Sequence, residues 1–161
     1  DKGVRKLQDE EFHVAVVRPP MIYGKGSKGN YPVLAKLAKK LPVFPDVKNA
    51  RSMLYIENLC EFLSLLMESG DGGIYFPQNR EYVRTSQMVK LIGKVSGHKV
   101  QVTKLLNPAV WIAGKIPGKV SGLANKAFGN MVYEKSMSDC FDRKYQVWNL
   151  KETIKRTEGE A

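Results

Sequence analysis

The 161-residue chain is poor in the residues that build metal, disulfide and redox sites. It has only two cysteines, Cys60 and Cys140, and only two histidines, His13 and His98. Neither cysteine has a C-x-x-C partner or a histidine nearby, so we expect reduced, buried thiols rather than a disulfide or a metal site. The histidines stand alone in the sequence, and we expect structural or solvated roles for them.

Long apolar runs and a targeting signal are also missing. No apolar stretch approaches the roughly 18 residues of a membrane span. The first residues include no methionine, and no apolar segment of a signal peptide follows them. We therefore expect a cytoplasmic chain that forms one domain over residues 1–161 and is a fragment of a longer protein.

Acidic residues are outnumbered, because 26 Lys and Arg face 16 Asp and Glu, which gives a net charge of +10. This balance suits an anionic partner such as nucleic acid, lipid headgroups or a phosphorylated small molecule. It equally suits a part of a protein whose acidic half lies elsewhere. The lysines are spread along the chain without a stacking-aromatic motif, so we expect no nucleic-acid partner.

One segment has the composition of a membrane-surface element. In PAVWIAGKIPGKVSGLANKAF, large apolar residues such as Trp111 and Ile112 alternate with lysines. The same pattern is typical of a substrate lid or a pair of packed helices. We expect the lid or helix pair, and no membrane partner.

Apolar spacing alternates between the helical and the strand period, which predicts an α/β fold. We expect helices at 2–11, 31–40, 56–69, 86–97 with Thr85 as N-cap, in 107–131, and from a capping box at Asn149 and Glu152. We expect strands at 13–18, 42–44, 74–76 and 99–105, and an edge-like segment at 132–138. Strand 13–18 should run parallel to one other strand of a truncated sheet.

The helix at 56–69 has the clearest apolar pattern. Its spacing predicts a buried face made of Ile56, Leu59, Cys60, Leu63, Leu66 and Met67. Phe62 and Leu65 lie off that face, so we expect this helix to be covered on more than one side.

Gly24-Lys25-Gly26-Ser27-Lys28-Gly29 is a literal G-x-G-x-x-G, the spacing of a dinucleotide-binding loop. In such a loop the first glycine follows its strand within a residue or two, whereas five residues separate Gly24 from the strand at 13–18. No strand after helix 31–40 fits the expected unit well, and Asp46, near the acidic position, lies in a proline-flanked loop. We therefore expect no pyrophosphate site here, and the Walker A pattern fails because Asn30-Tyr31 replaces Lys-Ser/Thr.

Four segments in order resemble the extended short-chain dehydrogenases/reductases, the family of nucleotide-sugar epimerases and dehydratases. VVRPPMIYGKGSKGN resembles the family's R-P-x-x-(V/I)-Y-G-x-G, and ARSMLYIENL resembles R-x-(F/Y)-(I/V)-x-(V/I)-x-(D/N)-L. IYFPQNREYVRTSQMVKLIGKVSGHKV is similar to a later strand and helix, and SMSDCFDRKYQVWNLKETI to the usual ending. The similarity spans essentially the whole chain, and UDP-galactose 4-epimerase-like proteins are the nearest members that we can name.

The resemblance implies a Rossmann-like fold and a division of labour between two parts of the protein. In the family an N-terminal domain carries the NAD glycine loop and a Tyr-x-x-x-Lys pair for acid/base chemistry. This chain has neither, so the resemblance implies the C-terminal part of the fold: a few sheet strands with a small mixed α/β substrate-binding subdomain. NAD would be held mainly by the N-terminal part, no residue here would be catalytic, and the isolated chain would be inactive and prone to self-association.

The resemblance also implies substrate contacts, residue by residue. Arg51 and Asn30 match family positions that bind the sugar nucleotide's diphosphate, and Lys126 falls near a second phosphate-binding arginine. Pro42 and Phe44 match the wall of the nucleobase pocket. The expected cofactor contacts near the nicotinamide are Pro19, Pro20 and Tyr23. Met21 stands where some relatives have asparagine, so the sugar, and whether the protein epimerises, dehydrates or reduces it, stay open.

Overall fold

Three pairs of short parallel strands organise residues 1–159, the part of the chain that the computed structural model describes; the side chains of Lys119, Val120 and Leu123 are not described. The pairs are β1 (Ala15–Val17) with β5 (Gly73–Tyr75), β2 (Met21–Tyr23) with β4 (Met53–Tyr55), and β3 (Val43–Pro45) with β6 (Gln101–Thr103). Parallel strands need crossover connections, and helices supply them here. The predicted α/β class and the parallel partner of strand 13–18 are confirmed.

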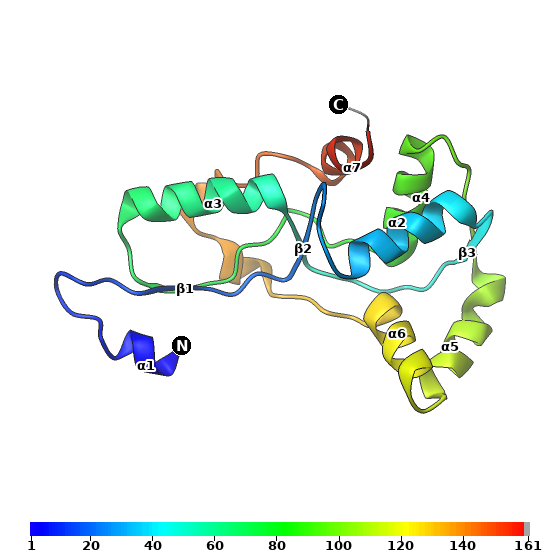
Figure 1. Ribbon diagram of the computed structural model, residues 1–161, viewed down its shortest axis with the longest axis horizontal. Helices are drawn as coiled ribbons and strands as arrows, with labels where there is room; N and C mark the ends of the chain where they lie inside the picture. Colours follow the sequence, from blue (N-terminus) through cyan, green and yellow to red (C-terminus); the bar gives the residue numbers. More distant parts are fainter. Residues whose placement is uncertain (160–161) are drawn as a thin grey trace.

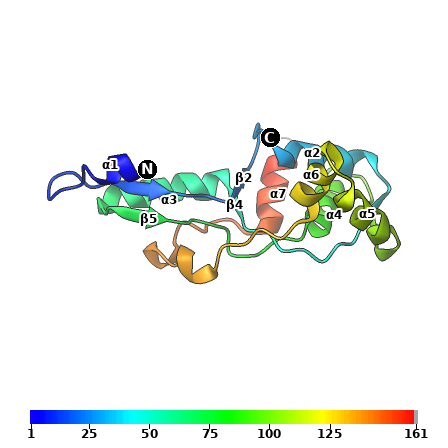
Figure 2. The same cartoon turned by 90° about the horizontal axis from the view of Figure 1, so that it is seen from below.

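Apart from α1 (Lys2–Arg5), which lies by itself near the N-terminus, the helices gather in three places (Figure 1). They are α2 (Asn30–Lys40), α3 (Ile56–Ser69), α4 (Thr85–Val95), α5 (Asn107–Lys115), α6 (Lys119–Phe128) and α7 (Leu150–Glu158). Helix α3 lies along the β1–β5 pair (Figures 1 and 2), whereas α2, α4 and α7 pack together at the other end of the molecule. Helices α5 and α6 pack on each other and form an arm beside that second group.

Two apolar clusters match this arrangement. The larger is built from β2, β4, α2, α4 and α7 and includes Tyr23, Met88 and Ile92. The smaller lies between α3 and the β1–β5 pair and centres on Phe62, whose ring contacts those of Tyr75, Phe141 and Tyr145. Among the described residues no helix is long and apolar enough to cross a membrane.

The predicted face of α3 is largely wrong. Leu59 and Leu66 do pack in the core, but Ile56, Cys60, Leu63 and Met67 are exposed. The buried stripe is instead Asn58, Phe62 and Leu66, at positions i, i+4 and i+8. Asn58 is polar and fully buried because its amide bonds the backbone of Trp148 and the side chain of Asn79, so apolar spacing alone does not find this face.

Several predicted boundaries also need correction. The helix expected at 2–11 ends at Arg5, and strand 99–105 is shortened to β6 because Lys104–Leu106 turns into a 3₁₀ helix. The edge-like segment 132–138 contains a 3₁₀ helix, Lys135–Ser138. A further 3₁₀ turn, Phe141–Arg143, precedes α7.

The two expected helix caps differ in outcome. The capping box of α7 is confirmed, since Asn149 and Glu152 each accept a hydrogen bond from the other's backbone N–H, at 3.1 and 3.0 Å. Thr85 is not an N-cap. It is the first residue of α4, and its hydroxyl donates to the carbonyl of Ala127 in α6 instead.

A buried polar pair, Gln78 and Asn79, joins the two apolar clusters. Asn79 accepts at Oδ1 from the Tyr55 N–H and from Asn58, each at 3.0 Å, and donates to the Tyr23 hydroxyl at 3.0 Å. Gln78 is fully buried, and its side chain bonds two surrounding segments: Ser52 before β4, and the stretch 133–138 through Tyr133, Glu134, Lys135 and Ser138. This short segment after β5 therefore links β4, α3 and the stretch between α6 and α7.

The orientation of α3 gives a stability prediction. Phe62→Ala removes a fully buried ring and should lower the free energy of unfolding by about 3–5 kcal/mol. Met67→Ala, on the same helix, should change it by less than about 0.5 kcal/mol because the Met67 side chain is 77% exposed. Urea unfolding followed by circular dichroism measures both. Equal losses for the two variants would contradict this orientation of α3.

Candidate functional site

An apolar cavity of about 340 Å³ opens between α2 and the α5–α6 arm. Three of the residues that the sequence singled out, Asn30, Arg51 and Lys126, line it together. They come from the start of α2, the segment before β4 and the last turn of α6. The remaining walls are Met21, Val33, Leu34, Leu37, Thr85, Ala113, Ala124, Ala127 and Phe128. An apolar pocket with a few converging polar groups is the usual form of a small-molecule site.

Arg51 is the most unusual member of this cavity. It is only 9% exposed, and burial lowers the pKa of its guanidinium. Its Nη1 donates to the Gly129 carbonyl at 3.0 Å, but among the described residues no carboxylate forms an ion pair with it. A buried cation without an anionic partner is costly, so such a residue marks a candidate anion site.

The backbone holds Arg51 in place from two sides. Its N–H and carbonyl exchange hydrogen bonds of 3.0 Å with Val83, and it also forms a parallel bridge with Met131. Arg51 therefore lies where three distant segments meet, with its side chain at the cavity.

Asn30 and Lys126 complete the polar part of the lining. Asn30 is the first residue of α2, and Gly29, with φ at 100°, is the N-cap before it. Lys126 is exposed at the cavity rim. With Arg51 they give the cavity two positive charges and one amide, a set of donors that suits phosphate oxygens.

Phe44 and Pro42 do not line the cavity. Phe44 is buried, and its ring centroid lies 5.7 Å from that of Phe128, which does line it. Pro42 is exposed, and its carbonyl accepts from the Gln101 N–H. Phe44 thus supports the aromatic wall from behind, whereas Pro42 lies away from it.

Sequence reasoning missed the residues that close the cavity. Thr85 bonds both Asn49 and the Ala127 carbonyl, and thereby ties α4 to α6. Phe128 supplies the aromatic surface. The sequence predicts Thr85 as a helix cap rather than as part of a site. Phe128 ends the segment that resembles a membrane-surface element or a lid, and nothing in the sequence indicates that its ring lines a cavity.

The expected cofactor contacts fall on the link between β1 and β2. Pro19 is half-buried and Pro20 buried in this link. Tyr23 is fully buried, and its hydroxyl bonds Thr153 at 2.7 Å and Asn79 at 3.0 Å. Burial raises the pKa of Tyr23 to about 12. The Tyr23 hydroxyl is thus engaged within the protein, and the expected contact of Tyr23 with a cofactor stays a prediction.

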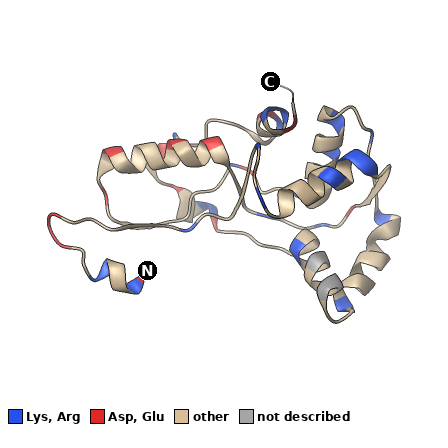
Figure 3. Cartoon of the chain, viewed as in Figure 1, with Lys and Arg blue, Asp and Glu red and all other residues tan. Residues whose placement is uncertain are grey.

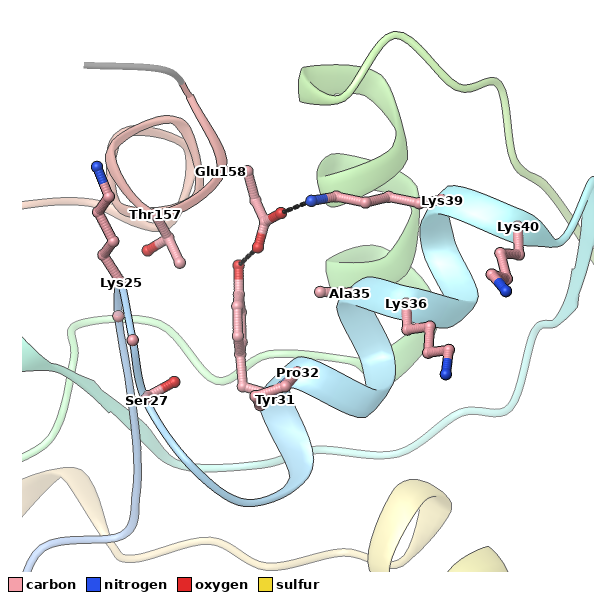
Figure 4. A pocket seen from close by; sticks show the side chains of 12 residues that line it. Lys25, Ser27, Tyr31, Pro32, Ala35, Lys36, Lys39, Lys40, Thr157 and Glu158 are labelled. Atoms are coloured by element: carbon pink, nitrogen blue, oxygen red, sulfur yellow. Dashed lines mark hydrogen bonds and ion pairs between the residues drawn. The ribbon is translucent and has the colours of Figure 1, made fainter.

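The glycine loop lies at a second cavity, of about 500 Å³, between α2 and α7 (Figure 4). Two premises drawn from the sequence are wrong here. Strand β2 ends at Tyr23, directly before Gly24, and it pairs in parallel with β4, so a strand, a G-x-G-x-x-G loop and a helix do follow one another.

Other features of the loop still do not fit a dinucleotide. Only Gly24 is closely packed, and a Cβ there would lie 2.4 Å from the Ile56 side chain of α3; around Gly26 and Gly29 nothing lies within 4 Å. The third glycine of a true fingerprint is needed for close helix–strand packing, which is absent at Gly29. Asp46, the expected ribose ligand, bonds Ser86 instead and does not line this cavity.

The carboxylate in this second cavity is Glu158, and it is already engaged. Figure 4 shows it between Tyr31, whose hydroxyl donates to it at 2.8 Å, and Lys39, whose ammonium lies 2.7 Å away. No group of three or more His, Cys, Asp or Glu side chains within residues 1–159 is arranged to hold a metal ion. Both cysteines are free, and Cys60 is exposed, whereas the sequence predicts a buried thiol.

Comparisons with known proteins bear on the fold. The structure aligns with dTDP-glucose 4,6-dehydratase of Bacillus anthracis in complex with NAD, with a TM-score of 0.58 and 18% identity over 89% of this chain and 43% of that one. It aligns with UDP-glucose 4-epimerase of Thermus thermophilus in complex with NAD, with a TM-score of 0.56 and 17% identity over 91% and 47% of the two chains. The fold is that of the extended short-chain dehydrogenases/reductases.

Sequence comparison agrees with this extended short-chain dehydrogenase/reductase fold. UDP-glucose 4-epimerase of Vibrio cholerae is 27% identical over 92 residues, which cover 54% of this chain and 28% of that protein. No family model matches the chain. The chain spans less than half the length of each of these three proteins.

The glycine-loop geometry predicts that this chain alone does not bind NAD tightly. Titration of the purified chain with NAD, followed by calorimetry, should show no saturable binding below millimolar concentration. A micromolar dissociation constant that is lost on Gly29→Val would contradict this prediction and make the loop a dinucleotide site.

Proposed function

We propose that this chain is the substrate-binding, C-terminal part of an NAD-dependent enzyme that acts on a nucleotide sugar. The observation that carries the proposal is Arg51, a buried guanidinium at the wall of an apolar cavity without a carboxylate partner among the described residues. A diphosphate would supply the missing negative charge. Two observations support this choice of ligand. The chain shares its fold with a dTDP-glucose 4,6-dehydratase and a UDP-glucose 4-epimerase, and its sequence is similar to that of another UDP-glucose 4-epimerase.

Each part of the cavity has a proposed task in binding. The Arg51 guanidinium and the Lys126 ammonium donate to the diphosphate oxygens, and the Asn30 amide adds a neutral donor at the start of α2. Phe128, held by Phe44, offers an apolar surface to the nucleobase. Pro42 is proposed only as an outer boundary of that region, because it lies away from the cavity.

The proposed reaction of the whole protein is 4-epimerisation of a UDP-sugar. Bound NAD supplies hydride chemistry at a sugar carbon. This chain's own residues bind and orient the nucleotide so that the sugar faces Pro19 and Pro20 at the carboxyl end of β1. The acid/base pair is assigned to an N-terminal Rossmann domain, and no residue of this chain is proposed as catalytic. The isolated chain is therefore proposed to be inactive, and the whole protein cytoplasmic.

The Arg51 assignment gives a binding prediction for the full-length protein. Arg51→Ala should weaken UDP-glucose binding by about 10- to 150-fold, because a charge-assisted contact contributes about 1.5–3 kcal/mol. Isothermal titration calorimetry measures the change. Arg143→Ala is the matched control, since Arg143 is an exposed arginine paired with Asp139, and it should leave binding unchanged.

Two further variants separate binding from folding. Lys126→Ala alters an exposed residue and should weaken binding less than Arg51→Ala does while leaving the thermal midpoint unchanged. Arg51→Lys keeps the charge but loses the planar fork, so it should restore binding only in part. Unchanged affinity in Arg51→Ala, with an intact circular dichroism spectrum, would remove Arg51 from the site.

The same proposal predicts self-association of the isolated chain. Within residues 1–159, β1 pairs only with β5, so its other edge offers free backbone groups, and α3 exposes the apolar residues Ile56, Leu63 and Met67. Unpaired edges and apolar faces promote association. Light scattering should show a dimer or larger species, and Leu63→Glu with Met67→Glu should shift it toward monomer. A stable wild-type monomer would contradict the prediction.

A further inference from the structure

The turn before α5 and the outer side of that helix expose large apolar side chains to an unusual degree. Leu105 is 88% exposed, Trp111 64% and Ile112 55%. Leu106 and Ile116 are exposed as well. We call this set, Leu105, Leu106, Trp111, Ile112 and Ile116, the outer apolar face.

The folding of α5 explains why these residues stay outside. Its half-buried positions are Asn107, Val110, Ala113 and Gly114, small or short side chains at i, i+3, i+6 and i+7, and α5 packs with this side on α6. No residue of α5 is fully buried. Trp111 lies at the edge of the contact with α6, where it lines a small cavity with Ala124 and Phe128, and the arm reaches away from the rest of the molecule (Figure 1).

The outer apolar face belongs to a region of one charge sign. Between Tyr82 and Tyr133 the sequence has eight of its 26 basic residues and none of its 16 acidic ones, so this stretch carries +8 of the net +10. Figure 3 shows the same asymmetry, because red residues lie on α3 and blue ones on α4, α5 and α6. Lys104 and Lys115 flank the outer apolar face directly, and the Lys115 ammonium lies 3.6 Å from the centre of the Trp111 ring.

This combination selects one kind of partner. Apolar side chains that include tryptophan, bordered by lysines, are what an element lying on a membrane surface presents. Lysines near an anionic leaflet add attraction, and acidic residues, which would oppose it, are absent from residues 82–133. A nucleic-acid site would instead use the charges, with no need for protruding leucine and isoleucine.

We propose that the outer apolar face docks on an anionic lipid bilayer, with Leu105, Trp111 and Ile112 entering the interface and Lys104 and Lys115 meeting the headgroups. The sequence alone favoured a lid or packing pair for this segment. The inner side of α5 does pack on α6 and borders the candidate cavity, and the outer side is free for a second task.

Vesicle flotation tests the proposal. The full chain should float with phosphatidylcholine vesicles that contain phosphatidylglycerol, and not with vesicles of phosphatidylcholine alone. In the Trp148→Phe variant, where Trp111 is the only tryptophan, fluorescence should shift to the blue on the anionic vesicles. Trp111→Glu with Ile112→Glu should abolish both signals, and Lys104→Gln with Lys115→Gln should weaken binding about fivefold per charge.

Matched variants keep the test specific. Leu63→Glu with Met67→Glu places the same charges on the exposed face of α3, and Lys2→Gln with Lys6→Gln removes two exposed lysines of α1 and the residue after it. Both should float as the unmodified chain does, and circular dichroism should report the same fold for all variants. Absence of flotation, equal flotation with neutral vesicles, or equal loss in the α3 control would overturn the proposal. Retention on duplex DNA without flotation would also overturn it, in favour of nucleic acid.

Discussion

The buried pair Gln78 and Asn79 is the interaction on which the rest of the structure depends. The strand pairs are only three residues long and do not join into one sheet, so backbone pairing alone links few distant segments. The side chains of this pair add links between segments, because every strong hydrogen-bonding group on them faces another part of the chain. Buried polar groups of this kind specify one arrangement, since any other leaves them without partners.

The same pair connects the core with the candidate site. Gln78 accepts from Ser52, the residue next to Arg51, and Ser52 also accepts from the Tyr133 N–H, which lies close to the Met131 bridge. The position of the Arg51 guanidinium is therefore set by contacts behind it, outside the cavity. A binding group that the surrounding protein already holds in position is preorganised. Ligand binding then costs less conformational entropy, because less of the protein must become ordered.

The sequence predicted the elements better than their packing. The α/β class, the parallel strand at 13–18 and the capping box at Asn149 and Glu152 follow from local patterns, which the structure retains. The buried face of α3 does not, because Asn58 is buried for its hydrogen bonds and apolar residues such as Met67 are exposed. Local spacing carries no information about which polar side chain will find a distant partner.

In the candidate site too, the sequence indicated residues better than it indicated their surroundings. The resemblance pointed to Asn30, Arg51 and Lys126, and the structure brings these three to one cavity, although their roles remain proposals. The resemblance also pointed to Tyr23 as a cofactor contact, and the structure shows this side chain fully buried. Its burial depends on Thr153, 130 residues away, and no nearby residue indicates that contact.

The paired strands lie far apart in the sequence, and this separation sets the order in which the structure assembles. Strands β1 and β5, and likewise β3 and β6, pair residues 58 positions apart, as in Ala15 with Gly73 and Val43 with Gln101. Gln78 meets its last partners only at Tyr145 and Gln146. Contacts between distant residues form late, because the chain loses loop entropy before they stabilise it. On the ribosome, α2 and α3 can form early, but the core stays open until nearly the whole chain has emerged.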